Sequence, residues 1–353
     1  MKKNINIGII GVGKISDLHI KGYKNMNNVE VTGISDINKK TLKEKARFWE
    51  VEKTTLDYRD LLEDKKIDVI DILTPHNLHS KIFIEALKSG KHVSVQKPMA
   101  ISDKECKAMI DESVKSDKKS RVFDNFLYYP PYIKAKTLIK DGVIGEIKSV
   151  RLKSILGYST DNQNIVNNWR FNEKINGGGK VLFDYGYHIF SVAYDLMGDI
   201  VKISSFVENT EMSDGSFLDC PGIIMWNYEN QNHGSWDIVR AHEIKINSDY
   251  FNEDEWFEIT GTEGFIWINR CSGKILDGPP LICFSKGEIN EINFTNEELD
   301  WGSSFNIGMK NFVDSIREDF NSKLSPSEGM KVFNYCKAAR LSSDQQKPVL
   351  LVK

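Results

Sequence analysis

The sequence has few cysteines, little net charge and no long apolar run, and each shortage excludes a class of protein. The five cysteines among 353 residues are scattered and form no C-x-x-C motif, so we expect reduced thiols and neither a disulfide framework nor a zinc site. No stretch approaches the roughly 18 uncharged apolar residues of a membrane helix. The formal net charge of -3 comes without basic runs, whereas nucleic-acid and membrane-surface binding usually need a basic patch. We expect a soluble globular protein with no nucleic-acid partner and no membrane partner.

The N-terminus also lacks a recognisable targeting signal. The two lysines after Met1 precede a short apolar run that Gly8 and Gly11 interrupt, and such a run is too short and too rich in glycine for a signal-peptide core. We therefore expect the protein to be located in the cytoplasm.

The chain is longer than the roughly 250 to 300 residues at which one hydrophobic core stops growing, so we expect two domains.

The first third of the chain alternates short apolar runs with helical patterns, which is typical of β-α-β units and a parallel sheet. A capping-box pattern from Ser102 to Glu105 predicts the start of one helix, and Gly90 predicts the end of another. The expected strands are Ile5–Ile10, Val29–Ile34, Asp68–Leu73, His92–Val95 and Arg121–Asp124.

After about Gly145 the pattern changes to longer alternating stretches, which favour largely antiparallel strands. One helix is expected before Gly198 and another after Pro326. The fold class is therefore α/β, with an N-terminal Rossmann doubly wound parallel sheet in residues 1–125. An α+β domain with a large, mostly antiparallel open sheet follows in 126–353, and its C-terminal helices are free to pack back on the first domain. The expected strands are 147–153, 201–205, 222–228, 234–240, 256–260 and 264–269.

A glycine-rich turn follows the first strand. Gly11-Val12-Gly13-Lys14-Ile15-Ser16 matches G-x-G-x-x-[G/A] with a small Ser at the last position. Glycine lets the backbone turn tightly and lets a pyrophosphate approach the amides at a helix N-terminus. The second strand ends in Asp36, where a carboxylate would accept hydrogen bonds from ribose hydroxyls and repel a 2'-phosphate. The cofactor is therefore predicted to be NAD rather than NADP.

Further motifs carry a resemblance to a known family. Thr74-Pro75-His76-Asn77-Leu78-His79 and Gln96-Lys97-Pro98 resemble the Thr-Pro-x-x-x-His and Glu-Lys-Pro segments of the glucose-fructose oxidoreductase, inositol dehydrogenase and rhizopine-catabolism (Gfo/Idh/MocA) family. The likeness continues in order through Trp169-Arg170, the glycines 177–179 and Asp184-Tyr185-Gly186-Tyr187-His188 to the terminal helix.

The resemblance implies a dinucleotide fold followed by a sheet domain that meets the substrate, in a homodimer or homotetramer. It implies that Lys97, Asp184 and His188 are catalytic. With the glycine turn it implies cofactor contacts from Gly11, Gly13, Lys14, Ile15, Asp36, Ile37, Thr74, Pro75, Asn77, His79, Gln96, Lys97, Asn125, Trp169 and Arg170. The expected substrate-binding residues are Lys97, Tyr128, Tyr158, Trp169, Asp184, Tyr187 and His188.

The chemistry of the three catalytic candidates supports the same roles. Oxidising a secondary alcohol removes a hydroxyl proton as the hydride leaves, and His has an ordinary pKa of about 6.5, near working pH. His188 is therefore the expected base. Asp184 lies four residues earlier, so on one helix both side chains would share a face, one turn apart. Lys97 would hydrogen-bond the same hydroxyl and stabilise the developing alkoxide.

Two positions depart from the family pattern. Gln96 stands where Glu is usual, so we hypothesise that the Lys97 ammonium loses its proton more easily here. Leu127 stands where relatives often carry Arg, amid several tyrosines. This favours a substrate with little negative charge; the alternative is that these aromatics pack the domain junction. The resemblance further suggests a cis peptide bond before Pro98.

The chain is thus expected to be an NAD-dependent dehydrogenase that acts on a ring CH-OH of a sugar, cyclitol or glycoside, with an aryl glycoside as one candidate. One alternative is an enzyme that retains NAD through a net elimination, hydrolysis or sugar-to-sugar redox exchange. Another is a non-catalytic NAD-binding regulator. His76 and His79 lie three residues apart without further ligands nearby in the sequence, so no metal is predicted.

Overall fold

The computed structural model describes residues 4–158, 169–212, 215–246, 248, 250, 252–269, 273 and 278–351. The chain forms two compact units, and each combines separate stretches of sequence. The first unit holds Met1–Asn125, Lys174–Gly177 and Ser304–Phe333, and the second holds Phe126–Glu173, Gly178–Ser303 and Asn334–Lys353. The domain boundary after residue 125 stays a prediction, because a compact unit need not fold independently.

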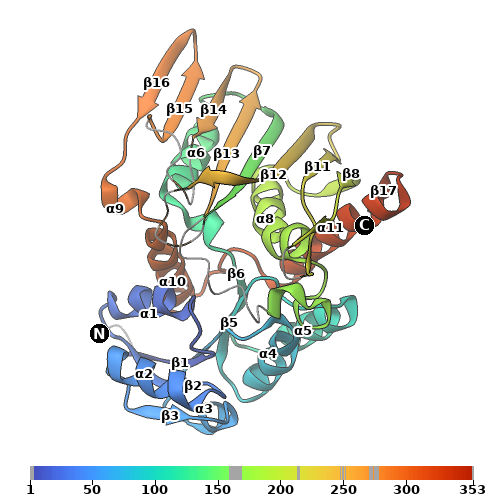
Figure 1. Ribbon diagram of the computed structural model, residues 1–353. Coiled ribbons are helices and arrows are strands. Elements are labelled where there is room, and N and C mark those ends of the chain that lie inside the picture. The colour runs from blue at the N-terminus through green and yellow to red at the C-terminus, as the bar shows by residue number, and fades with distance from the viewer. Residues whose placement is uncertain are drawn as a thin grey trace. The chain divides into compact units, whose positions relative to one another are not determined.

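The first unit contains a six-stranded parallel sheet in the order β3-β2-β1-β4-β5-β6. Figure 1 labels β1, β2, β3, β5 and β6 of this sheet. This doubly wound order reverses between β1 and β4, where ligands usually bind. The five strands expected from the sequence are confirmed to within a residue at their ends, whereas the three-residue β3 was too short to predict. The strands are β1 (Ile5–Ile10), β2 (Val29–Ser35), β3 (Lys53–Thr55), β4 (Val69–Ile72), β5 (His92–Gln96) and β6 (Ser120–Phe123).

The helices of the first unit start and stop where the sequence provides signals. At the start of α5 the Ser102 side chain accepts the Glu105 N–H at 3.3 Å, while the Glu105 carboxylate accepts the Ile101 N–H at 3.0 Å. Only the Ser102 half of the expected capping box is therefore formed. These helices are α1 (Ser16–Lys24), α2 (Lys39–Trp49), α3 (Arg59–Glu63), α4 (His79–Lys88) and α5 (Asp103–Lys115), with the short 3-10 turn η1 (His76–Leu78) before α4.

A helix from the last fifth of the chain completes this unit. From Ser304 onward, α10 (Trp301–Glu318) belongs to the first unit, and the sequence analysis did not predict it. A Cβ on Gly22 of α1 would lie 3.0 Å from Met309 of α10, so the absence of a side chain permits the close approach. Arg121 of β6 donates to the Gly308 carbonyl at 2.7 Å. The Rossmann sheet is therefore covered in part by residues nearly two hundred positions away.

The second unit is built on a nine-stranded sheet in the order β16-β15-β14-β13-β7-β12-β11-β8-β17. All of its neighbouring strands are antiparallel except β7 and β12, which confirms the expected fold class. The strands are β7 (Ile147–Tyr158), β8 (Ile200–Val207), β11 (Gly222–Tyr228), β12 (His233–Lys245), β13 (Glu253–Gly261), β14 (Gly264–Ile268), β15 (Leu281–Ser285), β16 (Glu288–Ile292) and β17 (Val349–Leu350); β9 (Thr210–Glu211) and β10 (Phe217–Leu218) pair separately.

The remaining helical segments lie in the second unit or are divided between the two units, and they include the two expected ones. One of these, α8, ends before Gly198, which has a φ of 81°, and the other, α11, begins at Pro326. The other helical segments are α6 (Pro130–Lys140), α7 (Glu173–Asn176), α9 (Asn296–Leu299), η2 (Asn125–Tyr128), η3 (Trp169–Phe171) and the π-helical η4 (Lys180–Tyr185), which runs into α8 (Gly186–Met197); α11 spans Pro326–Gln345. Within the described ranges, no helix is long and apolar enough to cross a membrane.

Candidate active site

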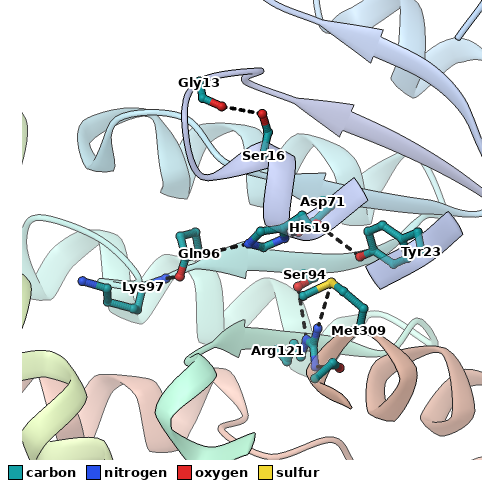
Figure 2. A network of polar contacts seen from close by, with 11 residues as sticks. Gly13, Ser16, His19, Tyr23, Asp71, Ser94, Gln96, Lys97, Arg121 and Met309 are labelled. Carbon is teal, nitrogen blue, oxygen red and sulfur yellow. Dashed lines mark hydrogen bonds and ion pairs between the residues drawn. The ribbon is translucent and has the colours of Figure 1, made fainter. Parts of the chain in front are cut away.

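The glycine turn after β1 has the geometry that the sequence analysis expected. Gly11 has a φ of 91°, and a Cβ there would lie 2.8 Å from the Leu73 carbonyl carbon. Gly13 is exposed, and a Cβ there would meet no atom within 4 Å. The buried Ser16 hydroxyl donates to the Gly13 carbonyl (Figure 2) and closes the turn. The turn therefore needs glycine at Gly11 for its own fold, whereas the space beside Gly13 is open for a ligand.

Asp36 links the end of β2 to this turn. Its Oδ2 accepts the Val12 N–H at 2.9 Å, and its Oδ1 accepts the Asn38 N–H at 2.8 Å. The side chain of Ile37 is 91% exposed beside it. Asn38 then caps α2 by accepting from the amides of the first turn. The carboxylate is therefore fixed at the edge of the glycine turn.

The Thr-Pro-x-x-x-His loop is held by its histidines. His79 is buried, with Nδ1 2.8 Å from the Pro98 carbonyl oxygen and Nε2 2.8 Å from the Thr74 carbonyl oxygen. It therefore ties the loop after β4 to the segment after β5, which shows that its ring nitrogens are engaged within the protein. His76 Nδ1 lies 2.9 Å from the Asn176 carbonyl oxygen. No group of three potential metal ligands occurs among the residues that the structure describes.

The third motif lies at the end of β5. The peptide bond between Lys97 and Pro98 is cis, as expected. Gln96 Oε1 accepts the Lys97 N–H at 2.8 Å, and Gln96 Nε2 lies 3.2 Å from His19 Nε2. The Lys97 side chain extends away from the His19 ring (Figure 2). The sequence analysis missed His19, because nothing in its spacing links a residue of the first helix to the end of the fifth strand.

In the second unit, Asp184 and His188 do not share one regular helix, which corrects the expectation from the sequence. Asp184 lies in the π-helical segment η4, with its N–H 3.3 Å from the Gly179 carbonyl, whereas His188 lies in the first turns of α8. Asp219 accepts the Val181 and Leu182 N–H groups at 2.9 and 2.7 Å. Because a π turn is wider than an α turn, the 100° per residue projection fails across this junction.

Asp184 is held by cationic side chains. It is 5% exposed, and its Oδ2 accepts from Arg170 Nε at 2.9 Å. The Arg170 guanidinium lies 4.6 Å from the centroid of the Trp169 ring, and Lys180 Nζ lies 4.8 Å from the Phe171 ring. Burial lowers the pKa of Lys180, while the negative charges of Glu253 and Asp184 raise it. Trp169, Arg170 and Asp184, which come from two separate motifs, are therefore brought together.

His188 lies against an aromatic cluster. Its ring stacks on Phe126, with centroids 4.2 Å apart and planes 13° apart, and is 9% exposed. Phe126 in turn meets the edge of Trp301 at 4.8 Å. This stacking fixes the plane of the imidazole. The sequence analysis did not single out Phe126, although it directly follows Asn125.

The remaining expected site residues differ in burial. Tyr128 and Tyr187 are buried in the second unit, and Asn125 in the first donates to Ser304 Oγ at 3.1 Å. Leu127 is buried as well. Tyr158 ends β7, and its side chain lies outside what the structure describes. The side chains of Lys14 and Asn77 are exposed, and those of Ile15, Thr74 and Pro75 are half-buried.

Beneath η4, a second cluster anchors the segment that carries Asp184. The Tyr185 hydroxyl contacts Ser154 Oγ at 3.2 Å and donates to the buried Glu255 carboxylate. Trp236 Nε1 donates to the same Ser154 oxygen at 3.0 Å. Burial, followed by the negative charge of Glu255, raises the pKa of Tyr185 well above its usual value. The strands β7, β12 and β13 therefore set the position of η4.

Comparisons with known proteins agree with this architecture. A model described as the oxidoreductase family, NAD-binding Rossmann fold, matches residues 5–123, and its C-terminal alpha/beta domain matches residues 136–351. Levoglucosan dehydrogenase of Pseudarthrobacter phenanthrenivorans is 29% identical over 296 residues, 76% of this chain and 74% of the relative. Myo-inositol 2-dehydrogenase of Thermotoga maritima is 27% identical over 353 residues, 98% of each chain. The structure of a levoglucosan dehydrogenase in complex with NADH and levoglucosan has a TM-score of 0.87 at 26% identity, and the match covers 99% of this chain and 100% of that one.

The chain belongs to the Gfo/Idh/MocA oxidoreductase family and is an NAD-dependent oxidoreductase. The residues of the first unit fit this cofactor. The open space beside Gly13 and the start of α1 at Ser16 suit a pyrophosphate, and Asp36 lies at the edge of the turn, where ribose hydroxyls would bind.

Proposed function

We propose that this protein moves a hydride between NAD and a ring CH-OH of a sugar, cyclitol or glycoside, with His188, Lys97 and Asp184 as its catalytic residues. The observation that carries the proposal is the arrangement in the second unit. A buried carboxylate held by Arg170 and an imidazole stacked on Phe126 lie on consecutive helical segments. Membership in a family of NAD-binding oxidoreductases supports the assignment of these residues to hydride transfer.

Each catalytic residue has a separate role. NAD, when bound by the first unit, would supply the hydride acceptor for oxidation and, as NADH, the hydride donor for reduction. His188 removes the hydroxyl proton during oxidation and returns it during reduction, because its ordinary pKa lies near neutral pH. Lys97 donates a hydrogen bond to the same oxygen and stabilises the developing negative charge. Asp184 accepts a hydrogen bond from the substrate, and its bond to Arg170 fixes the carboxylate in one orientation.

The names of the relatives guide the choice of substrate class. Levoglucosan and myo-inositol dehydrogenases both act on rings that carry several hydroxyl groups. Leu127 is uncharged, where the family resemblance implies that relatives often carry Arg. We therefore propose a neutral polyhydroxylated ring, with aryl glycosides as an extension to be tested.

A substrate panel tests this proposal. Levoglucosan, myo-inositol, hexoses and aryl glycosides are each supplied with NAD or NADP, and NADH or NADPH absorbance is followed. We expect NADH formation with at least one ring polyol and a much lower rate with NADP. If nicotinamide stays bound and substrate is consumed with no NADH release, the net reaction is an elimination, hydrolysis or exchange, and the proposed dehydrogenation is wrong.

Two variants test the catalytic residues. His188→Ala and Lys97→Ala should each lower kcat by about a hundredfold or more, since general acid-base catalysis contributes about that much, while NAD binding, followed by fluorescence titration, is retained. His233→Ala and Lys104→Ala are matched controls, because both side chains are exposed, and should keep full activity. Full activity in His188→Ala or Lys97→Ala would remove that residue from the mechanism.

We also propose that the chain forms a homodimer or homotetramer in the cytoplasm. Phe206 of β8 and Ile223 of β11 are paired across the sheet, and their side chains are 66% and 43% exposed. Such an apolar face favours association. Cys106, Cys220, Cys283 and Cys336 are buried thiols, as suits a reducing compartment. Light scattering of Phe206→Glu should show a smaller assembly than that of the parent protein, and an unchanged mass would contradict this role for the face.

A further inference from the structure

A buried network of polar contacts connects α1 with the end of β5 in the first unit. Tyr23 donates to Asp71 Oδ2 at 3.1 Å, and His19 Nδ1 lies 2.7 Å from the same oxygen. His19 Nε2 lies 3.2 Å from Gln96 Nε2, and Gln96 Oε1 accepts the Lys97 N–H (Figure 2). Tyr23, His19 and Asp71 are completely buried. This network of contacts therefore links the buried Asp71 carboxylate to the backbone N–H of Lys97, just after the end of β5.

The donors and acceptors of this network allow one arrangement of protons. Asp71 Oδ2 accepts, so His19 Nδ1 carries a hydrogen and donates it. Gln96 Oε1 already accepts from the Lys97 N–H, so its Nε2 faces His19 as a donor. His19 Nε2 must then be the acceptor, and the ring is neutral. The amide of Gln96 is thereby fixed from both ends.

The groups packed around His19 are consistent with a neutral ring. Phe123 of β6 and Phe305 of α10 meet the ring edge-on, at 5.1 and 5.4 Å between centroids. Asp71 of β4, Tyr23 of α1 and Gln96 of β5 supply the polar contacts. Burial and the negative charge of Asp71 raise the pKa of Tyr23, and the positive charge of Arg121 opposes the rise. Tyr23 therefore stays a donor to Asp71.

The Lys97 N–H is shared between two acceptors. It lies 2.8 Å from Gln96 Oε1 and 3.2 Å from the Phe123 carbonyl oxygen of the neighbouring strand. How strongly this N–H bonds to each of the two acceptors depends on the position of the Gln96 side chain. The contact with His19 sets that position. The orientation of the peptide that precedes the Lys97 side chain therefore depends on a residue 78 positions earlier in the sequence.

We propose that His19 is a positioning residue for Lys97, acting through the side-chain amide of Gln96, with Asp71 selecting the required tautomer. The proposal rests on the proposed catalytic role of Lys97 and adds a residue that the motif comparison did not assign. It also changes the meaning of Gln96. In Gln96→Glu a carboxylate oxygen would face His19 Nε2, so the ring would take up a second proton, and the charge summed over Asp71, His19 and position 96 would stay the same.

Two conservative variants separate positioning from simple packing. Asn at position 19 can keep a donor near the place of Nδ1, toward Asp71, but loses the acceptor for Gln96. Gln at position 19 can keep an acceptor near the place of Nε2 but loses the donor to Asp71. We expect His19→Asn to lower kcat about 10- to 100-fold, as small misplacements of a reacting group do, with the KM for NAD changed less than about threefold. His19→Gln should retain kcat within about threefold, and Tyr23→Phe, at the far end of the network, should retain full activity.

A spectroscopic measurement tests the same network without turnover. With 15N-labelled histidine, His19 should show the neutral Nδ1–H tautomer in the parent protein, with His19→Asn identifying its signals. In Gln96→Glu the same ring should show both nitrogens protonated. A doubly protonated His19 in the parent protein would overturn the proposal. So would equal kcat losses in His19→Asn and His19→Gln, which indicate a packing role alone.

The kinetics of Lys97→Ala keep the two proposals distinguishable. If Lys97→Ala loses turnover while His19→Asn keeps it, the positioning role of His19 is wrong and the catalytic role of Lys97 stands. If Lys97→Ala remains active, the catalytic role fails, and with it the functional meaning of the network, whatever tautomer the spectra report.

Discussion

The two units hold their site residues by different means. In the first unit, the glycine turn, Asp36 and Lys97 lie at the ends of parallel strands, and much of their geometry comes from main-chain groups. In the second unit, Asp184 and His188 depend on side chains from distant segments, such as Arg170, Asp219 and Phe126. A site at strand ends is therefore positioned largely by main-chain groups, whereas a site on a helical segment is positioned by the side chains that the segment packs against.

The largest effect that would test this comparison is at the glycine turn. Gly11→Ala should lower the free energy of unfolding by about 1 to 3 kcal/mol, because Gly11 has a positive φ and a Cβ would clash with the backbone at Leu73. It should also abolish NAD binding. Gly13→Ala is the matched control for the fold, since a Cβ there meets nothing within 4 Å. It should melt like the parent protein and still bind NAD at least about tenfold more weakly, because the cofactor backbone approaches closely there.

Thermal denaturation and NAD titration of both glycine variants separate the two effects. Equal losses of stability in Gly11→Ala and Gly13→Ala would contradict the distinction drawn between them. Unchanged NAD affinity in Gly13→Ala would show that the cofactor does not pass over this glycine.

The next effect concerns the side chain that holds Asp184. Arg170→Gln removes the charge of a partner 2.9 Å from a nearly buried carboxylate. We expect kcat/KM for the substrate to fall about 10- to 100-fold. Losing one partner of a fully buried charge pair costs about 3 kcal/mol. The cost should be smaller here, because the Arg170 side chain is 40% exposed. Arg59→Gln is the control, because Arg59 is exposed and pairs with the exposed Asp57 and the half-buried Glu85.

Steady-state kinetics in which the substrate and NAD are each varied in turn provide the measurement for this pair of variants. A rise confined to the KM for NAD in Arg170→Gln would assign Arg170 to the cofactor, as the sequence resemblance implied, instead of to Asp184.

The smallest effect is a dependence of stability on pH. Burial raises the pKa of Asp219 above 3.8, so the folded state holds its proton more tightly than the unfolded state does. The stabilisation from this group is fully present below pH 3.8 and is lost as the pH rises through the folded-state value. The Asp219→Asn variant has no titrating carboxyl group at this position, so it does not show this loss of stability. The unfolding free energy of the parent protein minus that of the variant should therefore fall with rising pH above 3.8, as measured by urea denaturation. A difference that is constant over this range would contradict the raised pKa.

The sequence was informative where structure and chemistry are local. It predicted the strands of the first unit and the turn at Gly11, because alternation and glycine spacing determine these features. It predicted α8 from its apolar spacing and Gly198, but not the π-helical turn at Asp184, because Asp219 and the glycines before it impose that turn. The contacts of Gln96 with His19 and of His188 with Phe126 arise from tertiary packing, which no spacing along the chain encodes.

The buried guanidinium of Arg121 has a consequence for protein engineering. It lies between the rings of Phe123 and Phe312 and donates to the carbonyl of Gly308. A gene fragment that stops at residue 125 would leave this cation without that carbonyl and without one of its two rings. Exchange of the cofactor-binding unit between homologues therefore has to transfer residues 304–333, and the short stretch 174–177, together with residues 1–125. These residues do not form one continuous piece of the gene.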